Sequence, residues 1–144
     1  MRNKPDITNW PRVTRIIQEG GFSDFSRANQ AVLARAQVFG RAVHLACLYY
    51  DRGSLDIKGI DTNLLPYLEG WWKFKNDNTW AKGEYILAEE QVYSKLYQFK
   101  GTPDRIYPGG YLVDIKTGQP NKGWGLQLAA YAQAAKETDR KSVV

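Results

Sequence analysis

Two carboxylates face each other in a β-hairpin that this sequence predicts. The turn Pro108-Gly109-Gly110 separates two short runs typical of strands, and a three-residue loop containing glycine is a common hairpin connection. If Tyr107 faces Tyr111 across that loop, counting outward places Asp104 opposite Asp114. The Cβ atoms of opposed residues lie about 4.5–5.5 Å apart, and like charges at that separation destabilise a sheet. The pairing becomes favourable when a divalent cation lies between the carboxylates, because hard cations take oxygen ligands.

A lysine lies beside the two carboxylates. Lys116 is two residues beyond Asp114, and side chains two apart on a strand share a face. Two carboxylates and an ammonium group therefore converge on one point, as they do in metal-dependent sites that cleave phosphodiesters. We therefore expect Asp104 and Asp114 to be metal ligands and Lys116 to be catalytic, in a site that cleaves phosphodiester bonds.

The motifs around these residues resemble those of the PD-(D/E)XK nuclease superfamily. Pro103-Asp104 and Asp114-Ile115-Lys116 resemble the signature itself, Gly101–Asp104 resembles Gly-x-x-Asp, and Asp114–Gly118 resembles Asp-x-Lys-Thr-Gly. Gln127 and Tyr131 resemble the Gln-x-x-x-Tyr motif of the RecB-like exonuclease branch, and Gly40 and His44 resemble its Gly-x-x-x-His helix motif. The stretch Pro11–Ile17 resembles the opening of phage-type members.

The resemblance covers residues from about 11 to about 136. It implies an α/β (α+β) fold with a restriction-endonuclease-like core, in which helices flank a small mixed β-sheet. It also implies a metal-dependent DNA nuclease, a hydrolase of DNA repair or recombination, with exonuclease action favoured by the Gln-x-x-x-Tyr motif. One or two Mg²⁺ or Mn²⁺ ions would be the cofactors, and single- or double-stranded DNA ends the substrate.

Further ligands follow from the same resemblance. It implies that the backbone carbonyl of Ile115 and the imidazole of His44 bind the metal, and a nitrogen donor suits Mn²⁺. Glu89 would be the third catalytic acid. The adjacent Glu90 points to the opposite face of a strand, so only one of the two can reach the ion. A structural core histidine at 44 and an exposed acidic pair at 89–90 are the alternatives.

Four residues near the C-terminus are expected to contact DNA. Gln127 and Tyr131 are four apart and share a helix face. By resemblance they would contact a phosphate or buttress Lys116; an amphipathic helix with both pointing outward is the alternative. Lys122 and Trp124 lie just before them. Trp124 can stack on a base or cap the core.

Periodicity gives the elements that must position these groups. The chain is expected to be a single domain of 1–144, with a loose leader (1–9), a helical part (10–77) and a sheet and catalytic core (84–144). Helices are predicted after Pro11, over Ser26–Tyr50, over Ile60–Asp77 and from Trp124 to about Ala135. Strands are predicted over Tyr85–Val92, over Tyr93–Phe99 and in the hairpin at 101–107 and 111–116. Lys141–Val144 resembles the start of a last, truncated strand, which a homo-oligomer or partner chain would complete.

Composition limits the partners, cofactors and location expected for this chain. The net charge of +5 suits a polyanionic partner. Cys47 is the only cysteine, so the chain alone cannot supply an iron–sulfur cluster or a disulfide. No apolar run approaches the roughly 20 residues of a membrane span, and the N-terminus lacks a signal-peptide core. We expect a cytosolic protein without a membrane partner, in the host cytosol if it is phage-encoded.

Two other functions stay open. A catalytically silent nucleic-acid-binding or recombination accessory module would keep the fold without turnover. A restriction or resolvase-like endonuclease would use the same carboxylates to cut within a strand.

Overall fold

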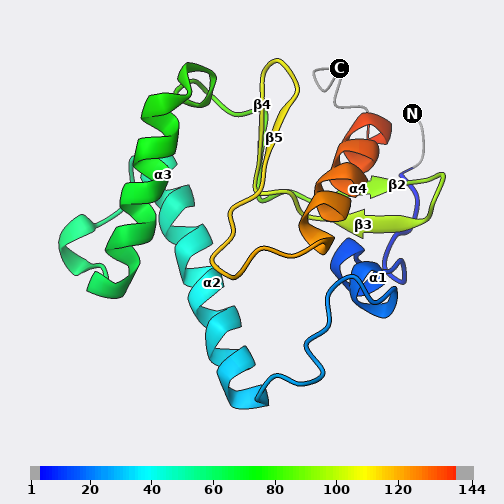
Figure 1. Ribbon diagram of the computed structural model, residues 1–144. Coiled ribbons are helices and arrows are strands. Elements are labelled where there is room, and N and C mark those ends of the chain that lie inside the picture. The colour runs from blue at the N-terminus through cyan, green and yellow to red at the C-terminus, as the bar shows by residue number, and fades with distance from the viewer. Residues whose placement is uncertain (1–3, 139–144) are drawn as a thin grey trace. The chain divides into compact units, whose positions relative to one another are not determined.

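The structure is a computed structural model that describes residues 4–138 (Figure 1). The chain forms two compact units. The sheet unit comprises the described residues of Met1–Phe25, Tyr85–Asp114 and Pro120–Val144, and the helical unit comprises Ser26–Glu84 and Ile115–Gln119. The predicted strand at 141–144 lies outside the described residues.

The sheet unit holds two small antiparallel sheets. One has the order β1-β4-β5, from Leu87–Ala88, Arg105–Tyr107 and Tyr111–Val113; the other pairs β2 (Val92–Ser94) with β3 (Phe99–Gly101). The α+β class is therefore as predicted. The predicted single mixed sheet differs from this, because all three ladders among the described strands are antiparallel and the parallel pairing of Arg12 with Lys100 is an isolated bridge.

The strands are shorter than the sequence predicts. The run Tyr85–Val92 is interrupted at Glu89, whose φ of 53° lies in the left-handed region and cannot continue a strand. The predicted strand 111–116 ends at Val113. Contrary to the prediction, strand periodicity therefore does not place Lys116 on the same face as Asp114.

The hairpin register is confirmed. Tyr107 pairs with Tyr111, and Arg105 pairs with Val113. In the turn between them Gly109 and Gly110 have φ values of 89° and 81°, a conformation that glycine adopts without steric cost. Continuing the register by one residue places Asp104 opposite Asp114, immediately beyond the strand ends.

Two helices pack against β2 and β3. They are α1 (Val13–Glu19) and α4 (Gly123–Glu137), close to the predicted ranges, and Figure 1 shows α4 running alongside the β2–β3 hairpin. Their shared core comprises Val13, Ile17, Leu87, Val92, Phe99, Ile106, Tyr131, Ala134 and Ala135. This core fixes the α4 face that carries Tyr131 against the strands.

The last turn of α4 is attached to the β2–β3 hairpin through one carboxylate. Glu137 accepts hydrogen bonds from Ser94 Oγ (2.7 Å), Lys95 N (2.6 Å), Leu96 N (3.1 Å) and Gln133 Nε2 (2.8 Å). Burial acts to raise the pKa of Glu137, but these donors outweigh it, and the pKa lies below its ordinary value.

Glu137→Gln should destabilise the fold at neutral pH and flatten its acid dependence. A carboxyl group whose pKa is lower in the folded than in the unfolded protein stabilises the fold when the pH is above its unfolded-state pKa. This stabilisation is lost as the pH falls through the folded-state pKa. We expect a loss of about 1 kcal/mol at about pH 7 and almost none at about pH 3, measured by urea unfolding. Glu19→Gln, on the exposed face of α1, is the control and should change stability by less than about 0.5 kcal/mol at either pH.

The helical unit is built from α2 (Gln30–Asp51) and α3 (Leu65–Asp77), with short 3₁₀ helices at Ile57–Gly59, Thr62–Leu64 and Thr79–Ala81. Asn29 begins α2 by accepting hydrogen bonds from the N–H groups of Ala31 and Val32. At its other end Asp51 accepts from Trp71 Nε1 (3.0 Å) and Lys75 Nζ (2.7 Å) of α3. Both predicted helices are thus present, the second beginning as a 3₁₀ turn.

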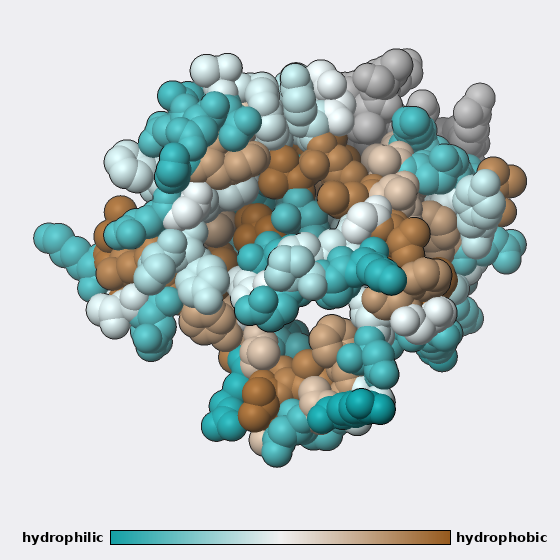
Figure 2. Space-filling model, in the orientation of Figure 1, coloured by the Kyte–Doolittle hydropathy of each residue, from teal (hydrophilic) through white to brown (hydrophobic). Residues whose placement is uncertain are grey.

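The surface of α2 is unusually apolar. Val32 and Val38 are more than half exposed, and Figure 2 shows brown side chains beside teal ones over the N-terminal half of this helix. Contrary to the expectation that no apolar stretch approaches the length of a membrane span, α2 is long and apolar enough to cross a membrane by length and composition alone. Core helices of soluble proteins pass the same test. The cytosolic location therefore stays a prediction.

Candidate metal centre

Glu89 and Asp104 bring two carboxylates together in the sheet unit. Ala88 of β1 pairs with Arg105 of β4, so the next residue pair along this ladder is Glu89 with Asp104. The backbone confirms the pairing, since Glu89 N donates to the Asp104 carbonyl at 3.1 Å. Their carboxylate oxygens lie within 4.8 Å of each other, close enough for two ligands of one cation.

Asp104 is the middle member of a row of three acids. The strand that begins directly after it, β4, lies between β1 and β5, so the two registers place Glu89 on one side of Asp104 and Asp114 on the other. Asp104 is only 3 % exposed, and the Oδ2 atom of Asp114 is buried. Three acids at one end of three neighbouring strands form the candidate metal centre.

The two adjacent glutamates are separated by their surroundings. Glu89 is half-buried and lies next to Asp104, whereas Glu90 is exposed. The positive φ of Glu89 is costly for a residue with a Cβ, about 1–3 kcal/mol, and such strain tends to cluster at functional sites. The geometry favours Glu89 over Glu90 as the third acid.

Tyr131 lies close to the acids from the side of α4. Burial raises the pKa of its hydroxyl, and the charges of Asp114 and Asp104 raise it further, against the opposing effect of hydrogen bonds with Gln127 and the Thr102 backbone. The hydroxyl accepts a hydrogen bond from Gln127 Nε2 at 2.9 Å. It therefore keeps its proton at neutral pH, within the electrostatic influence of both aspartates.

Gln127 and Tyr131 do not point outward. They are 8 % and 4 % exposed, so the amphipathic alternative, with both side chains in solvent, is wrong. Their DNA contact stays a prediction, and buttressing of the site is the role that suits their burial. Lys122 is exposed immediately before α4, and Trp124 is half-buried in its first turn; their predicted DNA contacts are likewise untested by the fold.

Gly101 makes the position of Tyr131 possible. A Cβ atom on Gly101 would overlap the Tyr131 ring, so the glycine of the Gly-x-x-Asp motif has a steric reason in this chain. The ring passes over β3 at this glycine and reaches toward the aspartates.

Gly101→Ala should therefore displace Tyr131. Overpacking of a buried aromatic ring costs about 1–3 kcal/mol, which urea unfolding would measure. Gly83→Ala is the control, because a Cβ there meets nothing within 4 Å, and it should be close to neutral. Equal stability of both variants would contradict the assignment of Gly101 to this contact.

The helical unit holds two other predicted ligands. His44 Nε2 lies 2.9 Å from the backbone carbonyl oxygen of Ile115. This separation fits a hydrogen bond donated by Nε2, and it equally fits two neighbouring ligands of an octahedral ion, which lie about 3 Å apart when each is about 2.1 Å from the metal. That His44 and Ile115 share an ion with the carboxylates stays a prediction.

Gly40, the glycine of the Gly-x-x-x-His motif, has a steric reason in this chain. A Cβ at Gly40 would be 3.3 Å from Thr117 Oγ1, a tight contact, so α2 approaches the segment Ile115–Gln119 closely. Lys116 lies in this same segment and is half-buried. Its role beside the acids remains a prediction from the sequence.

Arg105 is the residue that sequence reasoning missed. Composition places it among the basic residues of a solvated surface, yet it is completely buried in β4. Its Nη1 atom lies 3.5 Å from Glu89 Oε1 and donates to the Asp104 carbonyl at 2.7 Å. No local sequence signal separates it from exposed basic residues, because its burial follows from the place of β4 between β1 and β5.

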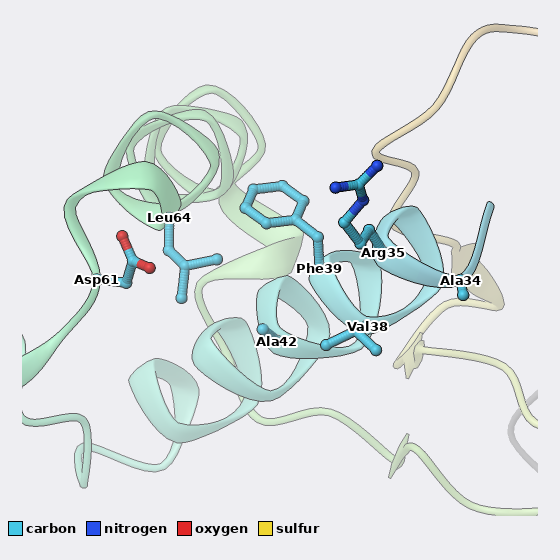
Figure 3. A pocket seen from close by; sticks show the side chains of 7 residues that line it. All are labelled: Ala34, Arg35, Val38, Phe39, Ala42, Asp61 and Leu64. Carbon is cyan, nitrogen blue, oxygen red and sulfur yellow. The ribbon is translucent and has the colours of Figure 1, made fainter. Parts of the chain in front are cut away.

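A pocket in the helical unit does not involve the predicted residues. It has a volume of about 450 Å³ and is lined by Ala34, Arg35, Val38, Phe39, Ala42, Asp61 and Leu64 (Figure 3). Figure 3 shows Phe39 and Leu64 extending from their helices toward the same space, so the lining is mainly apolar. Its side chains offer no set of metal ligands or nucleophiles.

In comparisons with known proteins, no family model, no curated protein and no solved structure matches this chain.

Proposed function

We propose that this chain is a Mg²⁺- or Mn²⁺-dependent nuclease that hydrolyses DNA phosphodiester bonds. The observation that carries the proposal is the row of acids in the sheet unit, with Glu89 and Asp104 within 4.8 Å and Asp114 next in register. Three neighbouring carboxylates repel one another, and Arg105 offsets only one of their negative charges. A hard divalent cation turns that repulsion into a binding site.

The donor set fits such an ion. Carboxylate oxygens from Glu89, Asp104 and Asp114 suit Mg²⁺ and Mn²⁺, and the proposed addition of His44 and the Ile115 carbonyl would favour Mn²⁺. When bound, the ion would lower the pKa of a water molecule and polarise a phosphoryl oxygen. The single cysteine rules out an iron–sulfur cluster held by this chain alone.

The remaining roles belong to side chains. Lys116 would orient the attacking water and stabilise negative charge on the phosphate. Tyr131 keeps its proton, because its pKa is raised, and can donate a hydrogen bond beside the acids. Gln127 holds the Tyr131 hydroxyl in place at 2.9 Å.

Exonuclease action on DNA ends is the more specific form of the proposal. It rests on the resemblance of Gln127 and Tyr131 to the Gln-x-x-x-Tyr motif, and on the net positive charge, which suits a DNA substrate. A place in DNA repair or recombination belongs to the same proposal.

A cleavage assay on linear and circular DNA tests it. End-labelled single- and double-stranded DNA and a covalently closed circle are incubated with the protein and Mg²⁺, Mn²⁺ or excess EDTA. The proposal expects digestion of linear DNA with either metal, an intact circle, and no digestion in EDTA. A cut circle would indicate a restriction or resolvase-like endonuclease instead. Binding without cleavage under every condition would overturn the nuclease and favour the accessory module.

A further inference from the structure

Arg105 is an unusual residue for the middle of a sheet. It is 0 % exposed and lies on β4, paired with Ala88 on one side and Val113 on the other. Arginine is almost never fully buried unless it is paired, because removing a charge from water is costly. A buried guanidinium therefore needs partners that justify its position.

Three of its contacts lie in the candidate metal centre or at its border. Nη1 donates to the Asp104 carbonyl at 2.7 Å and lies 3.5 Å from Glu89 Oε1. The guanidinium carbon lies 5.8 Å from the centre of the Tyr85 ring, a cation–π distance. The same Asp104 carbonyl also accepts from Glu89 N, so Arg105 and the backbone both fix Glu89 relative to Asp104.

We infer that Arg105 is a positioning residue that holds the Glu89 carboxylate against Asp104 so that the two can bind a divalent cation. The inference rests on the proposed function. Two carboxylates this close repel each other before the ion arrives, and a rotated Glu89 would have to be reordered on binding. A fixed positive charge behind Glu89 reduces that repulsion and leaves the carboxylate already oriented.

Mn²⁺ binding to the full chain tests this without any need for DNA cleavage. Arg105→Met keeps an unbranched buried side chain but removes the charge and the donors. We expect Mn²⁺ affinity, followed by the electron paramagnetic resonance signal of free Mn²⁺, to fall about 10- to 100-fold, the usual loss for a group that orients a metal ligand. Arg105→Lys should recover part of the affinity, because a charge remains but the planar fork does not.

A control separates positioning from loss of stability. Val13→Ala removes a buried side chain from α1, an element that carries none of the three acids. It should lower the urea midpoint while leaving Mn²⁺ affinity within about two-fold, because distant effects on a folded site are small. An equal fall in affinity for both variants would overturn the inference.

A double-mutant cycle shows whether Arg105 acts through Glu89. Glu89→Gln should weaken Mn²⁺ binding, and adding Arg105→Met to it should cause little further loss. A full additional loss in that background would overturn the inference. If Arg105→Met does not fold, Arg105→Lys is tested in the same cycle with the same criterion.

The outcomes separate this inference from the proposed function. One outcome is a wild type that binds Mn²⁺ and cleaves DNA while the folded Arg105 variants keep the same Mn²⁺ affinity. That result would overturn the positioning role of Arg105 and leave the nuclease intact. A wild type without Mn²⁺ affinity would overturn both. Mn²⁺ binding that depends on Arg105 without any DNA cleavage would support the positioning role and overturn the nuclease.

Discussion

We expect Asp104→Asn to lower the proposed DNA cleavage by at least about 10²–10³-fold, the loss typical when a group that stabilises the transition state through charge is removed. Asp104 is the middle acid of the row and is almost fully buried. Asparagine has nearly the same shape but carries no charge and replaces one oxygen by an amide nitrogen that cannot bind a hard cation. The rate follows from labelled linear DNA in the presence of Mn²⁺.

The same substitution should leave the metal-free protein at least as stable as the wild type. Asp104 and Glu89 have carboxylate oxygens within 4.8 Å, and neutralising one of them removes their repulsion. Mn²⁺ should raise the melting temperature of the wild type but not of the variant, since a ligand stabilises only the state that binds it. Loss of activity together with unchanged or increased stability identifies a functional acid.

Asp77→Asn is the matched control. Its carboxylate forms an exposed ion pair with Lys73 on α3, and such pairs contribute about 0–1 kcal/mol. Cleavage and the Mn²⁺ effect on melting should both be retained. Wild-type cleavage by Asp104→Asn would remove the assignment of the metal centre.

Lys116→Ala should lower cleavage by about 10²–10⁴-fold, the usual contribution of a positioned acid–base group. The defect should appear in kcat, because the ammonium acts on the attacking water and the developing charge. Mn²⁺ affinity should be unchanged or slightly higher, since the proposed role of Lys116 puts its positive charge near the ion. Single-turnover cleavage and metal titration of the same preparation measure the two effects separately.

Two lysine variants make this prediction specific. Lys116→Arg should not restore the rate, because a planar guanidinium is larger and has a different shape from a compact ammonium group. Lys122→Ala, at an exposed position before α4, should raise KM more than it lowers kcat if this lysine contacts the DNA backbone. A normal kcat in Lys116→Ala would mean that the lysine is an ordinary half-buried residue.

Local sequence signals determined the parts of the fold that depend on neighbours in the chain. The glycine turn at 108–110 set the hairpin register, because few turn types contain two residues with positive φ. The helices α1, α2, α3 and α4 also followed from periodicity and caps. The opposition of Asp104 and Asp114 is therefore a consequence of the turn residues and the strand count on either side of them.

The predictions that were wrong depended on where strands end. Alternation suggested that 111–116 is one strand, whereas β5 stops at Val113 and the next residues after Asp114 belong to the helical unit. A predicted mixed sheet became two antiparallel ones. Strand boundaries depend on partners elsewhere in the chain, which periodicity alone does not reveal.

The tertiary structure alone decided which other groups join the two aspartates. Glu89 is placed next to Asp104 by the β1–β4 register, a pairing of segments that no tight turn connects. Arginine is a residue type that usually lies on the surface, and Arg105 is buried only because it lies on the central strand. The sequence by itself determined the two opposed aspartates, because a short-range turn sets their register. Long-range strand pairing decided which other charged residues surround the aspartates, because burial and register depend on the whole sheet.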